Sequence, residues 1–421
     1  MFDGLPSNNC LDLLGLPGLP FPREAMKRRD LTRRAFLTTA SVTLGAAAVP
    51  SLSVSQELGA PRRAYGERSS FEESARYFHQ SATPTSDASW TPLQDLYGII
   101  TPSALHYEVH HYGVPQIDPA HHELMIHGLV DRPLIFTMKD LHRFPSVSRI
   151  HFLECAGNSG GEQAGRPGPD PQRSHGLLSC SEWTGVPLRV LLEEVRVKTN
   201  ARWIVAEGAD AGRLTRSIPL DKCFDDVLVA FGQNGEALRP EQGYPLRLVV
   251  PGFEGNVNTK WVGRIQVVDQ PYMTAYETGH YTDLMPNGKA RQFTFVMEAK
   301  SVITRPAGGQ HLSGPGFYEI TGLAWSGRGR ITRVEISTDD AKSWQDAQLN
   351  EPVLPKAISR FRLSWRWDGR ATSIRSRCTD ETGYLQPTRE EIVAVRGLHG
   401  TDHYNGIKIW YVKADGSVSH V

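Results

Sequence analysis

The chain has 421 residues with 46 basic and 46 acidic side chains, so its formal net charge is zero. This balance gives no electrostatic footprint for nucleic acid or for an anionic membrane surface, and we expect neither as a partner. The length suggests about two or three domains. With 28 prolines, 39 glycines and 39% apolar residues, the composition favours a strand-rich and loop-rich fold over a helix bundle.

Residues 1–50 are predicted to be an export-signal region. The stretch "TRRAFL" at 32–37 follows a basic segment and precedes a short apolar run to Val49. That run is too short to span a bilayer, so a removed signal is favoured over an anchor. The motif resembles a twin-arginine export signal, which predicts a periplasmic protein; a basic amphipathic start is the alternative. Met26 is a candidate for the true start. Residues 51–91 are polar, and we expect an irregular arm or linker.

Residues 92–297 alternate between strand-like and helix-like patterns. A short helix is expected to begin at Thr137 and to stop at Pro145. The segment "VPLRVLLEEVRV" has apolar residues at helical spacing. Strands are expected at "ELMIHGLV", "RWIVAEGAD" and "YPLRLVVPG". This region is therefore predicted to be an α+β domain.

Residues 298–421 are richer in short alternating segments. The stretches "GFYEITGLAWSG" and "RFRLSWRWDG" are aromatic-rich, and glycines separate them from their neighbours. Turn signals at roughly ten-residue intervals favour an all-β sandwich.

One cysteine, Cys155, occurs in "IHFLECAGNSGG", where a strand-like run meets turn-forming residues. Cys180, Cys223 and Cys378 follow it, and no C-x-x-C or C-x-x-C-H motif is present. From the residue alone, Cys155 could be buried filler, half of a disulfide, a nucleophile or a metal ligand.

Several motifs in order narrow this choice: "ITPSALHYEVHHYGVP", "HFLECAGNSGG", "EQGYPLRLVVPGFEGNVNTKWVGRI", "YTDL" and "LAWSGRGRITRVEIS". Together they resemble the sulfite oxidase family of molybdenum enzymes over roughly residues 92–415. Within the family, "VAFGQNGEALRPEQGYPLRLVVPGFEGN" and "IWYVKADGSV" look most like the molybdenum subunits of sulfane dehydrogenases from bacterial thiosulfate oxidation. The resemblance implies a molybdopterin-binding domain at 92–297 and an immunoglobulin-like dimerisation domain at 298–421, and hence a homodimer.

The resemblance also assigns site residues. Cys155 matches the thiolate ligand of molybdenum, and a metal-bound sulfur is deprotonated. Arg247 and Lys260 suit the phosphate of the pterin tail. Tyr281 matches the active-site tyrosine, and Arg330 matches a substrate arginine from the second domain, with Arg328 as its alternative. The positions that match contacts to molybdopterin are Tyr107, Glu108, Val109, His110, His111, Asp210, Arg247, Asn258, Thr259 and Lys260.

The chain departs from the sulfite oxidase pattern at positions where that family has arginines. Val109 and Gly160 occupy two of these positions, so the pocket is expected to be less cationic than one built for sulfite. Arg166 or Arg173 could substitute through a loop. Gln242 stands where many sulfite oxidases have a histidine.

Zinc is an alternative reading of the paired histidines at 110–111 and 121–122. Adjacent residues on a strand point to opposite faces, which disfavours a shared metal.

These observations predict an oxidoreductase that oxidises the outer sulfur of a cysteine persulfide on a carrier protein. The electrons must leave to a separate c-type cytochrome, because the chain has no haem-attachment motif. A periplasmic sulfite dehydrogenase acting on free sulfite is the alternative enzyme. A cofactor-free, β-rich scaffold or binding protein is the non-enzymatic alternative.

Overall fold

The computed structural model describes residues 64, 66–79, 86–398, 400 and 402–420. The predicted signal region at 1–50, with its twin-arginine motif, lies outside the described residues. From Ser74 to Val421 the described residues belong to one compact unit, whereas residues 64–73 belong to another and contain a turn and an Arg68–Glu72 ion pair. Among the described residues, no helix has the length and apolar character needed to cross a membrane.

A small antiparallel sheet opens the compact unit. It consists of β1 (Tyr77–His79), β2 (Asp87–Trp90) and β3 (Glu108–His110), in that order. The prediction of an irregular arm through residue 91 is therefore wrong at β1 and β2. These strands have only three and four residues, which is too short for a local strand pattern, and β2 pairs with the distant β3.

The first large sheet of the N-terminal domain, residues 92–297, carries the cysteine motif. Its strands are β6 (Val147–Glu154), β7 (Leu178–Pro187), β10 (Leu228–Gln233), β11 (Glu236–Ala237) and β12 (Arg247–Val249). The path runs β11-β10-β7-β6, and β12 pairs with β10. The run before Cys155 is thus a strand, as predicted, and the chain leaves β6 directly at Cys155.

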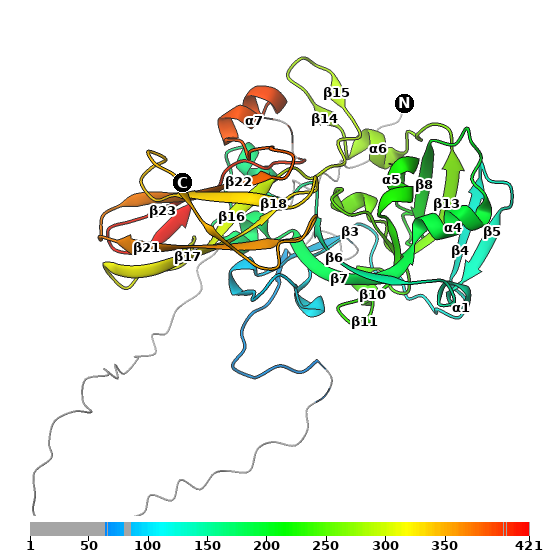
Figure 1. The fold of residues 1–421 in the computed structure, drawn as a ribbon, viewed down its shortest axis with the longest axis horizontal. Helices are drawn as coiled ribbons and strands as arrows, with labels where there is room; N and C mark the ends of the chain where they lie inside the picture. The colour runs from blue at the N-terminus through cyan, green and yellow to red at the C-terminus, as the bar shows by residue number, and fades with distance from the viewer. Residues whose placement is uncertain (1–63, 65, 80–85, 399, 401, 421) are drawn as a thin grey trace, which may run out of the picture. The chain divides into compact units, whose positions relative to one another are not determined.

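The second sheet has the order β5-β4-β13-β8-β9. Its strands are β4 (Glu123–Gly128), β5 (Leu134–Thr137), β8 (Trp203–Gly208), β9 (Thr215–Pro219) and β13 (Val262–Val268). Only the β4–β13 pair in this sheet is parallel. The two helices α4 (Leu188–Val195) and α5 (Leu220–Asp225) pack together beside this sheet (Figure 1).

Local sequence signals explain the helices of this domain. Thr137 caps α1 (Met138–Leu141) through a reciprocal capping box with Asp140. The predicted start at Thr137 is confirmed, whereas the predicted stop at Pro145 is wrong, because α1 ends at Leu141. The apolar spacing in α4 buries Leu188, Leu191, Leu192 and Val195. The remaining elements are α2 (Gly160–Gln163), α3 (Pro171–His175), α6 (Ala275–Gly279), the β14 (Asp283–Leu284) and β15 (Ala290–Arg291) hairpin, and 3₁₀ turns at Leu93–Asp95, Ser103–Leu105, Pro240–Gln242 and Gly255–Val257.

The C-terminal region is a two-sheet sandwich. One sheet has the order β16-β17-β21-β20, with β16 (Lys300–Arg305), β17 (Gly316–Trp325), β20 (Gln348–Asn350) and β21 (Ser359–Trp367). The other has the order β19-β18-β22-β23-β24, with β18 (Ile331–Ser337), β19 (Gln345–Asp346), β22 (Thr372–Asp380), β23 (Ile409–Val412) and β24 (Val418–His420).

The prediction of an all-β domain misses one helix, α7 (Arg389–Arg396). Thr388 begins it with a capping box to Glu391. This capping pair lies in the connection between β22 and β23, within a region whose alternating pattern predicts strands.

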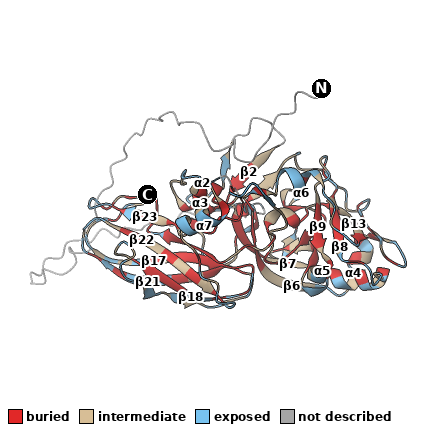
Figure 2. Ribbon diagram, turned by 90° about the horizontal axis from the view of Figure 1, so that it is seen from above, coloured by how far each residue is buried: buried red, intermediate tan, exposed pale blue. Residues whose placement is uncertain are grey.

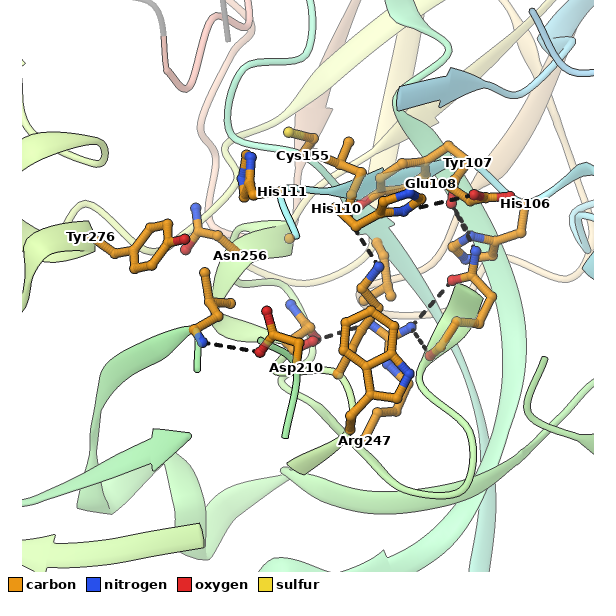
Figure 3. A pocket seen from close by; sticks show the side chains of 18 of the residues that line it. His106, Tyr107, Glu108, His110, His111, Cys155, Asp210, Arg247, Asn256 and Tyr276 are labelled. Atoms are coloured by element: carbon orange, nitrogen blue, oxygen red, sulfur yellow. Dashed lines mark hydrogen bonds and ion pairs between the residues drawn. The ribbon is translucent and has the colours of Figure 1, made fainter. Parts of the chain in front are cut away.

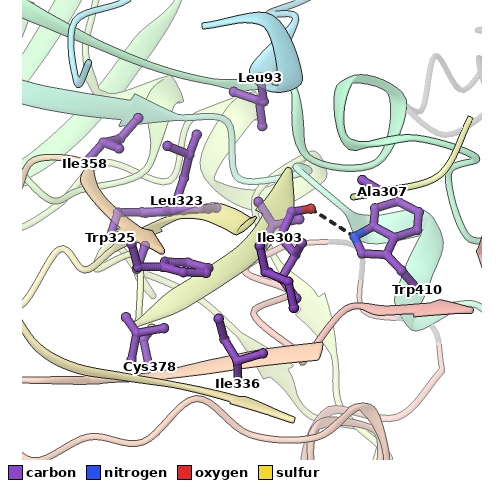
Figure 4. Packing of buried hydrophobic residues seen from close by; sticks show 14 of the residues in the cluster. Leu93, Ile303, Ala307, Leu323, Trp325, Ile336, Ile358, Cys378 and Trp410 are labelled. Carbon is purple, nitrogen blue, oxygen red and sulfur yellow. Dashed lines mark hydrogen bonds between the residues drawn. The ribbon is translucent and has the colours of Figure 1, made fainter. Parts of the chain in front are cut away.

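The two domains share a hydrophobic cluster. Leu93, Phe152, Leu178 and Cys180 of the N-terminal domain join the sandwich core around Trp325. Figure 4 labels Leu93 and Trp325 in this cluster. Figure 2 shows buried residues along the strands of both domains, with exposed residues on outer helices and loops. Phe152 lies on β6, the strand that ends at Glu154 directly before Cys155, so this strand packs against the sandwich core.

Candidate active site

Most of the predicted site residues line one pocket in the N-terminal domain (Figure 3). They come from β3 and the turn before it, the end of β6, the loop after β8, β12, the loop before β13, and the segment around α6. The predicted residues that line the pocket are Tyr107, Glu108, Val109, His110, His111, Cys155, Asp210, Arg247, Asn258, Lys260 and Tyr281.

Cys155 is the one pocket-lining cysteine. Its backbone amide donates to the Leu177 carbonyl at 3.0 Å, and its carbonyl accepts from the Asn158 amide at 2.9 Å. Among the described cysteines none forms a disulfide; Cys155 is half-buried, whereas Cys180, Cys223 and Cys378 are buried. Burial raises the pKa of Cys180 to about 12 and raises the pKa of Cys223 and Cys378 as well. Those three thiols are protonated filler, and Cys155 is the sulfur with access to the pocket.

Gly255 lets the backbone approach Cys155. A Cβ built on this glycine would lie 2.8 Å from the Tyr107 hydroxyl oxygen and 3.2 Å from the Cys155 Cα. Any larger residue would displace the tyrosine or the cysteine loop.

Two cations, the buried Arg247 and the half-buried Lys260, lie in the pocket without a carboxylate partner among the described residues. Arg247 donates to the Gln242 carbonyl at 2.9 Å, and the Lys260 Nζ donates to the carbonyls of Val109 at 3.0 Å and Glu241 at 3.1 Å. Burial lowers the pKa of Arg247 to about 10, and burial together with the Arg247 charge lowers the pKa of Lys260 to about 7. Neutral carbonyls compensate these charges only partly, so the pocket is prepared for an anionic group.

The pocket histidines are uncharged at neutral pH. Burial lowers the pKa of His106 to about 3 and the pKa of His110 and His111 to about 4. The buried Nε2 of His106 and Nδ1 of His110 have no hydrogen-bond partner within the described structure. These nitrogens are available to a bound group.

The remaining predicted cofactor contacts differ in position. Asp210 accepts from the Leu214 amide at 3.1 Å, and the Asn258 amide group bonds backbone atoms of Val250 and Glu254, which fixes the loop before Lys260. Thr259 is fully buried and does not line the pocket. Its hydroxyl has no partner in the described part of the chain.

The two predicted catalytic residues are not brought together. Tyr281 lines the pocket, but Arg330 does not, and its guanidinium pairs with Glu381 at 3.2 Å on the sandwich domain. The alternative Arg328 pairs with Glu298 at 3.1 Å. Each arginine thus pairs with a glutamate of its own domain, and neither arginine lines the pocket.

Val109 and Gly160, which stand where sulfite oxidases have arginines, add no positive charge to the pocket. The Val109 carbonyl accepts from Lys260, and Gly160 is buried at the start of α2. Arg173 pairs with Asp170 at 2.6 Å, and neither it nor Arg166 lines the pocket. Gln242 does line it, and its amide donates to the Tyr107 carbonyl at 2.9 Å.

The zinc alternative gains no support from the geometry. The His122 Nε2 lies 3.0 Å from the Val262 carbonyl, and exposed His121 pairs with Asp118. Among the described residues, no group of three or more His, Cys, Asp and Glu side chains could hold a metal.

Some lining residues were missed from the sequence. His106, Asn256 and Trp261 lie inside the quoted motifs, and that position was the available signal. Tyr276 carried none, because it lies on α6, outside those motifs. The missed residues are His106, Leu153, Leu214, Gly255, Asn256, Trp261 and Tyr276.

The chemistry of the pocket fits molybdopterin. A half-buried thiol lines the pocket, a buried arginine and a half-buried lysine lack carboxylate partners among the described residues, and two buried histidine nitrogens have no hydrogen-bond partner there. Cys155 would hold the metal, Arg247 and Lys260 the phosphate, and His106 and His110 polar edges of the pterin.

Comparisons with known proteins agree with this fit. Residues 111–276 match the family described as oxidoreductase molybdopterin binding domain, and residues 291–410 match the Mo-co oxidoreductase dimerisation domain. A crystal structure of the sulfane dehydrogenase SoxCD from Paracoccus pantotrophus is 46% identical, with a TM-score of 0.85. That match covers 87% of this chain and 96% of the other.

Curated relatives are longer proteins. An NADH nitrate reductase of Solanum lycopersicum is 32% identical over 71% of this chain and 37% of the relative. The mitochondrial sulfite oxidase of Mus musculus is 30% identical over 64% of this chain and 52% of the relative. The chain thus matches about a third to a half of the length of these proteins.

Proposed function

Because the chain belongs to the sulfite oxidase family of molybdopterin oxidoreductases, we propose that it oxidises the sulfane sulfur of a cysteine persulfide on a carrier protein during thiosulfate oxidation. We further propose that it acts in the periplasm as a homodimer and passes electrons to a c-type cytochrome. The similarity to a sulfane dehydrogenase supports the substrate, the dimerisation-domain match supports the dimer, and the twin-arginine motif supports the location.

The observation that carries the substrate assignment is the charge of the pocket. Val109 and Gly160 stand where arginines would hold a sulfite dianion, and the pocket histidines are neutral at pH 7. Arg247 and Lys260 are the basic residues left, and the phosphate of the cofactor would occupy them. A persulfide carries less charge than sulfite and therefore needs less cationic compensation.

When bound, molybdopterin supplies two-electron redox chemistry and oxygen transfer to sulfur. Each such oxidation adds an oxygen atom from water to the substrate sulfur and releases two protons and two electrons. The residues of this chain orient the substrate and handle the protons. The Tyr281 phenol can donate a hydrogen bond to a substrate oxygen or relay a proton from the pocket.

The test compares two electron donors on the molybdenum-loaded protein. Cytochrome c reduction is measured with a carrier-peptide persulfide and, separately, with free sulfite. The proposal predicts turnover of the persulfide and little or none of sulfite. Prompt cytochrome c reduction by free sulfite, without any carrier, would contradict it.

A substitution at one of the missing arginines sharpens this test. Val109→Arg restores a cation beside the substrate and is expected to lower the KM for sulfite about tenfold or more, the size expected of a charge-assisted contact. Val109→Leu is the size control and should leave the KM for sulfite unchanged.

A further inference from the structure

Arg216, on strand β9, is a fully buried arginine that lies just outside the pocket. Its Nε donates to a Glu277 oxygen at 3.0 Å, and one terminal nitrogen donates to a Glu254 oxygen at 3.0 Å. The other terminal nitrogen donates to the side-chain oxygen of Asn256. The guanidinium is therefore bonded on all its nitrogens.

Arg216 also stacks on the predicted catalytic tyrosine. Its guanidinium carbon lies 4.5 Å from the centroid of the Tyr281 ring. A cation in this position is attracted by the negative face of the ring, and the planar guanidinium matches the ring in shape. Lysine could supply the charge but not the plane.

The partners of Arg216 come from two separate segments that both line the pocket. Asn256 lies in the 3₁₀ turn Gly255–Val257, whereas Glu277 lies on α6 and Tyr281 follows that helix. The five-residue α6 is too short to hold its own conformation. The Glu277 carboxylate ties it to β9, since it also accepts from the Ser217 amide at 2.8 Å.

A buried ion network of this kind contributes little net stability, because removing the charges from water costs free energy. Glu254, Glu277 and Arg216 are all buried, and His403 from the sandwich domain closes the group with its Nε2 at 2.9 Å from Glu254. Replacing buried ions of this kind with apolar residues is often neutral or stabilising. Its directional bonds, however, fix the two pocket segments in one geometry.

We propose that Arg216 is a positioning residue: it holds Tyr281 and Asn256 at the pocket wall and acts on the substrate through them, without touching it. The kinetic part of this inference rests on the proposed sulfur oxidation, whereas the placement of Tyr281 does not.

The kinetic test uses Arg216→Met and Arg216→Lys in the molybdenum-loaded protein. With glutathione persulfide as donor and ferricyanide as acceptor, Arg216→Met is expected to lower kcat/KM about tenfold or more per molybdenum, as small displacements of a reacting geometry do. Arg216→Lys should recover part of that loss. Arg264→Lys is the matched control, because Arg264 on β13 pairs with Glu207 on β8 and is partly exposed. It should retain wild-type kinetics.

A double-mutant cycle shows whether Arg216 acts through the tyrosine. In a Tyr281→Phe background, Arg216→Met should lower kcat/KM by a clearly smaller factor than in the wild type, because coupled sites are not additive. The same factor in both backgrounds would overturn the proposal.

A spectroscopic readout decides the placement without any substrate. In protein labelled with 3-fluorotyrosine, the Tyr281 fluorine signal is identified by its loss in Tyr281→Phe. Arg216→Met should shift and broaden that signal, and Arg264→Lys should not. An unmoved signal in a variant with native melting temperature would overturn the proposal.

If Arg216→Met does not fold, Glu277→Gln takes its place with the same expectations and the same contrary outcome. If no persulfide is turned over, the proposed function fails while the fluorine signal still decides the role of Arg216.

Discussion

The side-chain amine of Lys300 lies 2.9 Å from a carboxylate oxygen of Glu154, and both residues are fully buried. Glu154 immediately precedes Cys155, and Lys300 begins the first strand of the sandwich. The second oxygen of Glu154 accepts from the indole nitrogen of Trp325 at 2.6 Å. The backbone that presents the predicted metal ligand is therefore fastened to the sandwich domain by charge as well as by the shared hydrophobic cluster.

Removing the lysine should destabilise the protein strongly. Lys300→Met leaves the Glu154 carboxylate buried without its cation, which is expected to lower the free energy of unfolding by about 3–5 kcal/mol. Urea denaturation followed by tryptophan fluorescence measures it. Lys342→Met is the control, since Lys342 is largely exposed and its amine lies as far as 4.0 Å from the Asp340 carboxylate. Equal losses in the two variants would contradict this role of Lys300.

Lys260 predicts a pH dependence of the cofactor-free protein. Its pKa is lowered by burial to about 7, whereas an unfolded lysine titrates near 10.5. Between these values the unfolded chain binds more protons, so this residue makes the free energy of unfolding rise with pH from about 7 to about 10. Urea midpoints across this range should rise more in the wild type than in Lys260→Met. Identical pH profiles would contradict the prediction.

Asp402 predicts the opposite slope at lower pH. Burial, followed by the Glu254 charge, raises the pKa of Asp402 to about 7 from an ordinary value of 3.8. The folded protein then binds the extra proton, so the contribution of Asp402 is present below about pH 4 and is lost as the pH rises through 7.

Asp402→Asn should therefore be more stable than the wild type at pH 8, by on the order of 2 kcal/mol. At pH 4 the difference should vanish, which thermal melts at both values would show. A wild type that is the more stable protein at pH 8 would rule this out.

Much of the fold could be predicted from local signals, and the limits are physical. Thr137 marked the start of α1, helical spacing marked α4, and the apolar run before Cys155 marked β6. Strand β2 could not be found, because its pairing with β3 depends on residues far along the chain.

The site likewise contains residues that sequence motifs predict and residues that they do not. Residues inside recognisable motifs, such as Lys260 and Tyr281, do line the pocket. Arg216 carried no motif, because its partners on α6 and in the 3₁₀ turn meet it only after folding. Arg330 matched a motif, yet it does not line the pocket and pairs with Glu381. Sequence position alone does not show such a pairing.

X-ray absorption at the molybdenum edge measures whether the Cys155 thiolate binds molybdenum. We predict one more sulfur neighbour per molybdenum in the wild type than in Cys155→Ser, and the wild-type count in Cys378→Ser. If Cys155→Ser keeps the full molybdenum content and the full number of sulfur neighbours, Cys155 is not the ligand.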